Sequence, residues 1–296
     1  MNHYADLCTE VTARLVAAID NGPGGWVMPW HTTPGLFDVR NAATDNRYRG
    51  ANTITLAVAA LERAYTTGWW ATYRQWSDLG AQVRRGETAS RVTKWVAPRT
   101  NTPETMTEDD GTVLQALGGR RLVPKVYPVF NAEQVDGWTT PNTAPAAEHH
   151  RDEHADNWIN ATGAEIRHGY GHACYRPAAD VIEVPDLGRF CDPAAYYSTV
   201  CHELAHWTGH PTRLNRDLTG RFGDDAYAAE ELVAELGAAF ACALLAITPT
   251  PRDDHAAYLA HWLRILRADP KALFTVAARA QAAVDHLDHR VDEPQP

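Results

Sequence analysis

The sequence lacks the features of membrane and exported proteins. No apolar run in its 296 residues approaches the length of about 18 that a bilayer-spanning helix needs. The N-terminal residues 1–6 lack the basic and apolar regions of a signal peptide. The five cysteines are odd in number and form no Cys-x-x-Cys pair, which is typical of reduced thiols rather than of a disulfide framework. These absences predict a cytoplasmic protein.

The chain also has no overall excess of positive charge. Its 27 Lys and Arg against 37 Asp and Glu give a net charge of −10, which argues against a simple basic nucleic-acid binder. Residues 1–140 carry 14 basic and 14 acidic side chains, whereas residues 141–296 carry 13 basic and 23 acidic ones. The whole acidic excess therefore lies in the second half. Such an asymmetry indicates two domains with different partners.

The boundary between the two domains is predicted at residues 139–152. This stretch is rich in Pro, Thr and Ala and has no hydrophobic periodicity, as expected for a linker. We therefore predict a first domain at 1–138 and a second at 153–296. Both parts contain helical and strand patterns, so the fold class is predicted as α+β with two domains.

The other elements are predicted from hydrophobic spacing and from turn residues. The polar, acidic stretch 99–119 is expected to be a long exposed hairpin loop or a disordered insertion. The strand predicted at 180–185 comes just before the main motif, and its edge is expected to be where an extended peptide docks. Helices are predicted at 3–20, 53–65, 152–162, 253–268 and 270–289, and further strands at 69–73, 91–96, 122–131 and 165–168.

The strongest motif lies in the acidic half and reads His202-Glu203-Leu-Ala-His206. It is expected on a helix bounded by Pro193 and Gly209, because proline suits a first turn and glycine suits the C-terminal end. Residues four apart share one helical face, so both histidines can bind one metal ion. Glu203 lies about 100° around the helix, where it can act as a general base toward a water at that ion.

The third metal ligand is expected on the next helical pattern. Glu231 and Glu235 are four residues apart and share a face. The block resembles the gluzincin pattern, in which an acid four residues after the ligand glutamate hydrogen-bonds a ligand histidine. On that match Glu231 is the ligand and Glu235 orients a histidine, while Glu230 is either the alternative ligand or a second residue behind the histidines. The competing interpretation is a solvated acidic helix face. Two His and a carboxylate favour Zn²⁺, and Mn²⁺ also suits them.

The first domain contains a basic stretch despite its zero net charge. Residues 40–99 hold ten Lys and Arg against four acids, interleaved with Trp and Tyr. Aromatic faces beside guanidinium groups suit single-stranded DNA, because bases stack and phosphates pair without sequence being read. The competing interpretation places the tryptophans in the core and the arginines on a solvated face. The candidate contacts are Arg47, Arg49, Trp70, Tyr73, Arg74, Trp76, Arg84, Arg85 and Lys94, with Trp70 and Trp76 as the favoured stacking residues.

Taken together, the two halves resemble the ArdC-type antirestriction proteins, which are related to the N-terminal region of TraC-type plasmid primases. The resemblance covers nearly the whole chain. It rests on several motifs, among them Tyr48-Arg49-Gly50-x-Asn52, Trp70-x-Thr-Tyr73-x-Gln75, His202-Glu203-Leu-x-His206-Trp-Thr-Gly-His210 and Glu230-Glu231-Leu-Val-Ala-Glu235. It implies an N-terminal domain that binds single-stranded DNA and a C-terminal zincin-like metallopeptidase domain. It also implies protection of incoming plasmid DNA from host restriction during conjugation.

Two functions remain open at the level of sequence. In the first, the protein is an antirestriction factor whose main partner is single-stranded DNA, and its metal domain is structural, regulatory or proteolytic. In the second, the protein is foremost a metallopeptidase, and the N-terminal domain directs it to a target. In addition to DNA, the candidate partners include a host restriction enzyme or another protein substrate. The presence of Glu203 favours catalytic competence, because a bare metal ion needs no general base.

Overall fold

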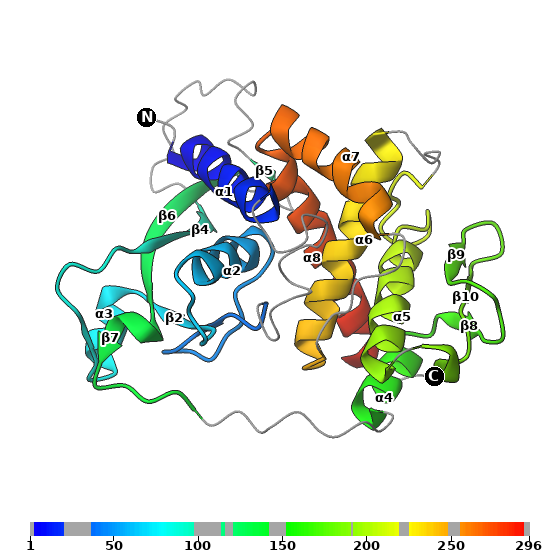
Figure 1. The fold of residues 1–296 in the computed structure, drawn as a ribbon, viewed down its shortest axis with the longest axis horizontal. Helices are drawn as coiled ribbons and strands as arrows, with labels where there is room; N and C mark the ends of the chain where they lie inside the picture. The colour runs from blue at the N-terminus through cyan, green and yellow to red at the C-terminus, as the bar shows by residue number, and fades with distance from the viewer. Residues whose placement is uncertain are drawn as a thin grey trace.

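The computed structural model describes residues 3–20, 37–97, 114–115, 121–141, 152–190, 192–218, 225–247 and 255–292. Most of the predicted loop at 99–119 and of the predicted linker at 139–152 lies outside these ranges. Figure 1 shows an N-terminal half, with a curved sheet and helices packed on it, beside a C-terminal group of long helices. Within the described ranges, no helix is both long and apolar enough to cross a membrane.

The N-terminal half is a sheet covered by two helices. The strand order is β1-β2-β6-β4, with β5 paired to β6; β1 and β2 are parallel and the other pairs are antiparallel. Apolar residues recur every four positions in the first helix and form one buried stripe, as their spacing in the sequence predicts. They are Leu7, Val11, Leu15 and Ile19. The elements are α1 (His3–Asp20), β1 (Arg40–Asn41), α2 (Ala51–Glu62), β2 (Trp69–Ala71), β4 (Ser90–Val96), β5 (Leu114–Gln115) and β6 (Arg121–Asn131).

A smaller lobe projects from this sheet around a short helix. Thr72 begins that helix with a capping box, in which its side chain accepts from the backbone N–H of Gln75 and the Gln75 side chain returns to Thr72. The lobe has its own small core, with Trp76 completely buried at its centre. Its elements are α3 (Tyr73–Asp78), β3 (Gln82–Val83), the 3-10 turn η3 (Ala132–Gln134) and β7 (Val135–Asp136), and β3 pairs with β7.

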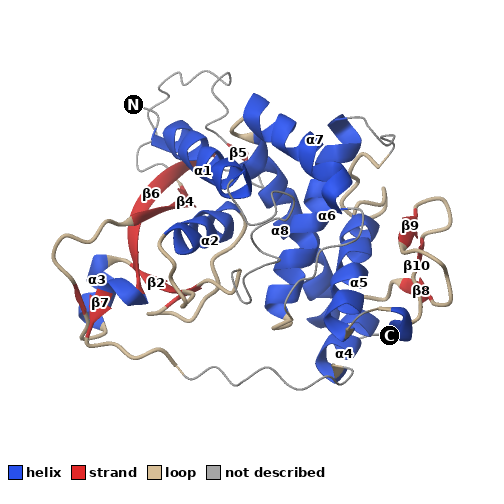
Figure 2. Cartoon of the chain, viewed as in Figure 1, coloured by secondary structure: helices blue, strands red, loops and turns tan. Residues whose placement is uncertain are grey.

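Figure 2 shows that the C-terminal half combines helices with a small sheet, and its described residues form five α-helices and a three-stranded sheet. The strand order is β8-β10-β9, so β10 is central and β9 is an edge strand. The prediction that the strand at 180–185 offers the docking edge is therefore wrong, because β10 has a neighbour on each side. The elements are α4 (Glu153–Ala161), β8 (Glu165–Arg167), β9 (Cys174–Arg176), β10 (Val181–Glu183), the 3-10 turn η4 (Leu187–Arg189), α5 (Pro193–Thr208), α6 (Asp225–Leu244), α7 (His255–Ala268) and α8 (Ala272–Asp292).

The two halves share one hydrophobic core. Buried side chains of α1 and α2 belong to the same continuous cluster as buried side chains of α6 and α8. Polar contacts add to this packing: Arg47 Nη1 donates to the carbonyl of Ala243 at 2.9 Å, and the backbone N–H of Gly50 donates to Gln281 Oε1 at 2.9 Å. The two halves are therefore distinct along the sequence but packed together in space.

Candidate metal centre

The metal centre is built on two helices that approach each other closely. Helix α5 begins with Asp192 as N-cap, whose carboxylate accepts from the backbone N–H of Ala195 at 2.7 Å. Helix α6 packs against α5 with Gly237 facing Ala205. A Cβ atom placed on Gly237 would lie only 2.9 Å from the Ala205 Cβ. Glycine at this position therefore permits a helix separation that a larger residue would not.

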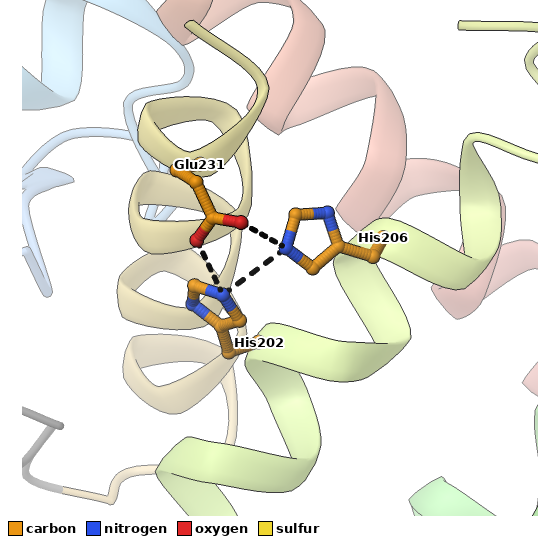
Figure 3. A group of neighbouring side chains, drawn as sticks. All are labelled: His202, His206 and Glu231. Atoms are coloured by element: carbon orange, nitrogen blue, oxygen red, sulfur yellow. Dashed lines mark hydrogen bonds and ion pairs between the residues drawn. The ribbon is translucent and has the colours of Figure 1, made fainter. Parts of the chain in front are cut away.

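Three donor side chains converge between these helices, as Figure 3 shows. The Nε2 atoms of His202 and His206 lie 3.2 Å apart. Glu231 places one carboxylate oxygen 3.4 Å from His202 Nε2 and the other 3.5 Å from His206 Nε2. Donors at about 2.0–2.1 Å from a tetrahedral ion stand about 3.3 Å from one another. The donor set and its spacing fit a divalent metal ion, and the structure brings together the three residues that the sequence predicts as ligands.

The site is buried and strongly polarised. Burial by itself would lower the pKa of His206, but hydrogen bonds to Glu230 and Glu231 outweigh it and raise that pKa to about 10. Burial would likewise raise the pKa of Glu231, yet the two histidines hold it well below its usual range. Without an ion, His206 therefore carries a proton between two carboxylates, and a divalent ion would take the place of that positive charge.

The residues behind the histidines differ in part from the prediction. Glu230 lies on the far side of His206, with Oε1 3.3 Å from Nδ1, and so orients that ring instead of ligating the ion. Glu235 lies 3.9 Å from His202 Nδ1, which is an ion-pair distance but too long for a hydrogen bond. Of the two alternatives left open by the sequence, the geometry favours Glu231, which lies beside both Nε2 atoms, whereas Glu230 lies behind His206.

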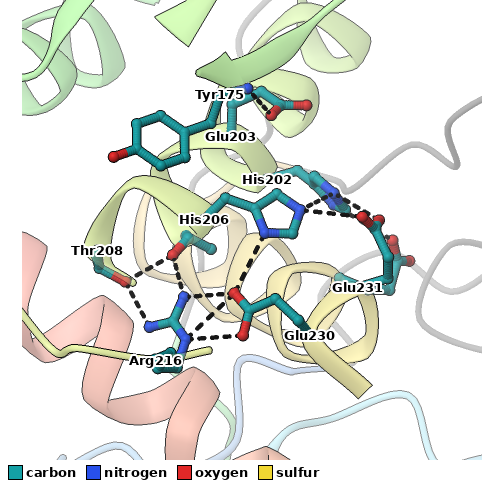
Figure 4. Close-up of polar contacts among 10 residues, drawn as sticks. Tyr175, His202, Glu203, His206, Thr208, Arg216, Glu230 and Glu231 are labelled. Carbon is teal, nitrogen blue, oxygen red and sulfur yellow. Dashed lines mark hydrogen bonds and ion pairs between the residues drawn. The ribbon is translucent and has the colours of Figure 1, made fainter. Parts of the chain in front are cut away.

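The Glu203 side chain is held by a residue outside the His-Glu-x-x-His motif, on a neighbouring strand. The Glu203 side chain is buried, and its Oε2 accepts from the backbone N–H of Tyr175 at 2.8 Å. Tyr175 lies on β9, so the edge strand of the small sheet adjoins the metal helix at this carboxylate, as Figure 4 shows. Sequence reasoning missed Tyr175, because a backbone donor carries no residue-type signal.

Sequence reasoning also missed Arg216, which appears in Figure 4 beside Glu230. Its Nη2 donates to Glu230 Oε1 at 2.9 Å, and its Nε donates to Oε2 at 3.0 Å. Both side chains are only 9% exposed. Arg216 falls in a stretch that reads as a polar loop, and nothing in its local sequence marks it as part of the site.

Two of the predicted DNA-stacking residues are core residues. Trp70 and Trp76 have no exposed surface, so the prediction that they stack on bases is wrong. Trp76 donates its indole N–H to the carbonyl of Phe130 at 3.0 Å and packs edge-on against Trp138. Trp70 packs edge-on against Tyr65 within the larger core. Both rings are needed by the sheet and the lobe, which leaves no face for a base.

Two of the predicted DNA-binding arginines are engaged between the halves. Arg47 pairs with Asp38 at 2.7 Å in addition to its contact with Ala243. Arg49 forms an ion pair with Asp285 on α8. These contacts supply a structural reason for both residues. They also neutralise part of the basic stretch from which a DNA-binding surface is predicted.

The remaining candidates are exposed and lie mostly on the small lobe. Tyr73 is 53% exposed, and the Arg74 side chain is 93% exposed. A hollow of about 540 Å³ on this lobe is lined by Tyr73, Arg84 and Arg85, with Phe130 among the other lining residues. Lys94 is exposed on β4, outside this hollow. The structure thus brings an aromatic ring and two predicted arginines together, but not with the tryptophans.

Each half of the chain matches a protein family. Residues 5–130 match the N-terminal domain of the anti-restriction factor ArdC, and residues 153–279 match the zincin-like metallopeptidases. The donor triad on α5 and α6 lies within the second match. The fold and the site therefore define a two-domain α+β protein with a C-terminal zincin-like metallopeptidase domain.

Similar proteins extend the match over the whole chain. The crystal structure of the antirestriction protein ArdC from the R388 plasmid, metal-free, is 35% identical with a TM-score of 0.77, covering 98% of this chain and 100% of that one. Its Mn(II)-bound structure is 36% identical with a TM-score of 0.76 and the same coverage. The uncharacterized protein y4eC of Sinorhizobium fredii is 40% identical over 98% of this chain and 94% of its own length. This chain belongs to the ArdC family of antirestriction proteins.

The DNA primase TraC of Escherichia coli is also similar. It is 38% identical over 94% of this chain, which corresponds to only 26% of the primase. The shared part therefore amounts to about a quarter of TraC.

Proposed function

We propose that this protein is an antirestriction factor that binds single-stranded DNA and protects incoming plasmid DNA from host restriction during conjugation. The observation that carries the proposal is the similarity to the ArdC antirestriction protein, which covers 98% of this chain and all of that one. The match of residues 5–130 to the N-terminal domain of ArdC supports the same role for the first half.

The hollow on the small lobe is the surface that we propose for single-stranded DNA. The Tyr73 ring is held edge-on against Phe130, and its hydroxyl accepts from Gln82 Nε2 at 2.9 Å, so an exposed aromatic face is fixed in place. Arg84 and Arg85 line the same hollow, and Arg84 also pairs there with Glu87 at 3.1 Å and with Asp136 at 3.5 Å, so a phosphate would compete with these two carboxylates. A base can stack on the ring while phosphates pair with the guanidinium groups, and neither contact reads sequence.

Binding of a fluorescent oligo(dT) to the full chain, measured by anisotropy, tests this surface. Tyr73→Ala is expected to weaken binding by about 1–3 kcal/mol, the usual contribution of one stacked base. Replacing both Arg84 and Arg85 by alanine is expected to reduce the dependence of affinity on salt, because fewer counterions are released. Leu79→Ala, at an exposed position just after α3, is the control and is expected to bind as wild type.

The possible results test separately whether the chain binds DNA and whether the hollow on the small lobe is the binding surface. If the wild-type chain fails to bind oligo(dT) at low salt, DNA binding itself is refuted. If the wild type binds and the Tyr73 and arginine variants bind equally well, the DNA lies on another surface.

We propose that the second domain carries peptidase chemistry. His202, His206 and Glu231 would hold the ion, which is Zn²⁺ or the Mn²⁺ found in the ArdC structure. When bound, the ion supplies Lewis acidity at the scissile carbonyl. Glu203 takes the proton of the attacking water and delivers it to the leaving amine. The extended substrate lies along the outer edge of β9, the edge strand among the described residues, whose Tyr175 N–H adjoins Glu203.

Proteolysis as the main role is the second candidate function, and the buried, hydrogen-bonded Glu203 favours it. Glu203→Gln tests the choice, because it retains the shape of the side chain and removes the base. The variant is expected to keep its metal and to lose all peptide hydrolysis. Restriction protection measured side by side for wild type and Glu203→Gln then decides whether antirestriction requires the peptidase chemistry. Full protection by the variant would rule out proteolysis as the antirestriction mechanism.

A further inference from the structure

We propose that residues 209–218, called here the return loop, position both reactive parts of the site through two separate arginines. Arg216 fixes the orientation of His206 through Glu230. Arg213 fixes the edge strand β9, and with it the Tyr175 N–H that holds Glu203. The metal ligand and the proton-transfer group are thus set by two side chains only three residues apart.

The return loop supplies hydrogen-bond donors to the carbonyl groups at the C-terminal end of α5. The last four carbonyls of an α-helix have no partner within the helix, and they form the negative end of its dipole. In α5 each of these carbonyls accepts from the return loop, and two of the donors are guanidinium groups. The pairs are Ala205 with Arg216 Nη2 at 2.6 Å, His206 with Gly209 N at 2.8 Å, Trp207 with Arg213 Nε at 2.7 Å, and Thr208 with Leu214 N at 2.9 Å.

The first arm runs from Arg216 to the metal site. Arg216 contacts both oxygens of Glu230, and Glu230 in turn contacts His206 Nδ1, as Figure 4 shows. A buried carboxylate held by two donors of one guanidinium has little freedom to turn. Its remaining contact therefore fixes the plane of the His206 ring, whose other nitrogen faces the ion position.

Gly209 makes room for this arm. Its φ of −74° is ordinary, so no special backbone conformation requires a glycine. A Cβ atom there would instead lie 2.9 Å from Leu218 Cδ2, 3.0 Å from the His206 carbonyl oxygen and 3.1 Å from Arg216 Nη2. The missing side chain is what allows the guanidinium to lie against the end of α5.

The second arm runs from Arg213 to the edge strand. Its Nη1 donates to Asp180 Oδ2 at 3.0 Å, and its Nη2 donates to the Tyr175 hydroxyl at 3.2 Å. Tyr175 donates its hydroxyl to Asp180 Oδ1 at 2.8 Å. The guanidinium also stacks on the Trp207 ring at 3.8 Å from its centre. Arg213 therefore ties the side chain of Tyr175 to the end of α5, while the backbone of the same residue holds Glu203.

The two arms act on different groups, so their effects are separable. Arg216 touches neither Asp180 nor Tyr175 in the contacts of the described chain, and Arg213 does not touch Glu230. A loop that merely stabilises the helix end would show the same loss on removal of either arginine. A positioning loop would instead show two distinct losses, and each arginine variant is the control for the other.

Metal affinity tests the first arm. The metal-free full chain is titrated with Mn²⁺ against a competing chelator. Arg216→Met is expected to weaken Mn²⁺ binding by about 10–100-fold, the usual effect of removing a residue behind a ligand. Arg213→Met is expected to keep the wild-type affinity. Arg216→Lys, which retains the charge beside Glu230, is expected to recover part of the loss.

Hydrogen exchange of the Tyr175 amide tests the second arm. Arg213→Met is expected to speed this exchange by about tenfold, the factor that one hydrogen bond contributes. Arg216→Met is expected to leave it unchanged. Glu203→Ala removes the acceptor itself and is expected to speed exchange at least as much.

Equal losses in both assays for both variants would overturn the proposal, as would wild-type Mn²⁺ affinity in Arg216→Met or unchanged Tyr175 exchange in Arg213→Met. Thermal unfolding in chelator identifies a variant that does not fold, and Glu230→Gln and Tyr175→Phe then repeat the two tests one step further along each arm. The catalytic meaning of the second arm rests on the proposed role of Glu203. Neither readout requires peptide hydrolysis, so an inactive wild type would refute the peptidase proposal without affecting these results.

Discussion

Gly237→Ala is expected to push the two metal-bearing helices apart. The new Cβ would lie 2.9 Å from the Ala205 Cβ, whereas non-bonded carbons rest at about 3.5–4.0 Å. Relief of this contact requires a displacement of about 0.6–1.1 Å between α5 and α6. The two histidines belong to α5 and Glu231 to α6. The displacement therefore changes the 3.4 and 3.5 Å distances from the Glu231 carboxylate oxygens to the histidine Nε2 atoms.

The substitution should weaken metal binding as well as the fold. Donor positions in a metal site tolerate about 0.2 Å, so the shift removes good geometry from one of three ligands. We expect a loss of Mn²⁺ affinity of about 10–100-fold, comparable to the loss of an orienting residue. The fold loses about 1–3 kcal/mol through overpacking but regains about 0.5–1 kcal/mol, because alanine is the better helix former.

Isothermal titration of the metal-free chain with Mn²⁺ measures this effect, and thermal unfolding in chelator measures the cost to the fold. The matched control is the double variant Gly237→Ala with Ala205→Gly, which exchanges the two residues across the contact. It is expected to recover most of the affinity. Wild-type affinity in Gly237→Ala, or failure of the double variant to recover it, would refute the link between helix spacing and the metal site.

Three further predictions concern the core, the pH dependence and the ligands. Trp76→Ala is expected to destabilise the protein by about 3–5 kcal/mol in denaturant unfolding, and weakened DNA binding with unchanged stability would contradict its core role. Despite burial, the neighbouring glutamates raise the pKa of His206 to about 10, so metal binding must displace a proton. Calorimetry should show affinity rising about tenfold per pH unit between about pH 7 and 9, and a flat profile would contradict this. In chelator, the stabilisation from that raised pKa is complete below about pH 6.5 and is lost as the pH rises through about 10. Elemental analysis should find about one divalent ion per wild-type chain and none in His202→Ala or His206→Ala. A metal content equal to that of the wild type in both variants would contradict the assignment.

The parts of the site that depend on helical spacing could be predicted from the sequence. His202 and His206 lie four apart on one helix, and their common face follows from helix geometry alone. The choice between Glu230 and Glu231 could not be made, because neighbouring helix positions differ only by a rotation of about 100° and the packing of α6 decides which one faces α5. The contacts of Tyr175, Arg213 and Arg216 join residues distant in sequence or lie in loops, where no periodicity applies.

The fold shows the same division between local and long-range information. The spacing of apolar residues predicts the first helix at the bounds that the structure gives to α1. The order of strands in the small sheet depends on pairing, and the sequence could not show that β9 lies outside β10. Interleaving of tryptophan with arginine likewise could not reveal which rings are buried. Thr72 and Gln75 are the one local signal for the burial of Trp76, because their capping box begins the helix that places this side chain inside the lobe.

The shared core of the two halves makes the chain a single cooperative unit. Loss of either half would expose apolar surface of the other, so any ligand that binds only the folded state stabilises both. An ion at a hundred times its dissociation constant adds about 2.7 kcal/mol to the free energy of unfolding of the whole chain. The lobe around Tyr73 has its own small core and joins the rest of the chain through β2 and β6, so it shares this gain only where it unfolds together with the sheet. Metal supply would thereby influence the stability of the surface proposed to bind DNA, whether or not a peptide bond is ever cut.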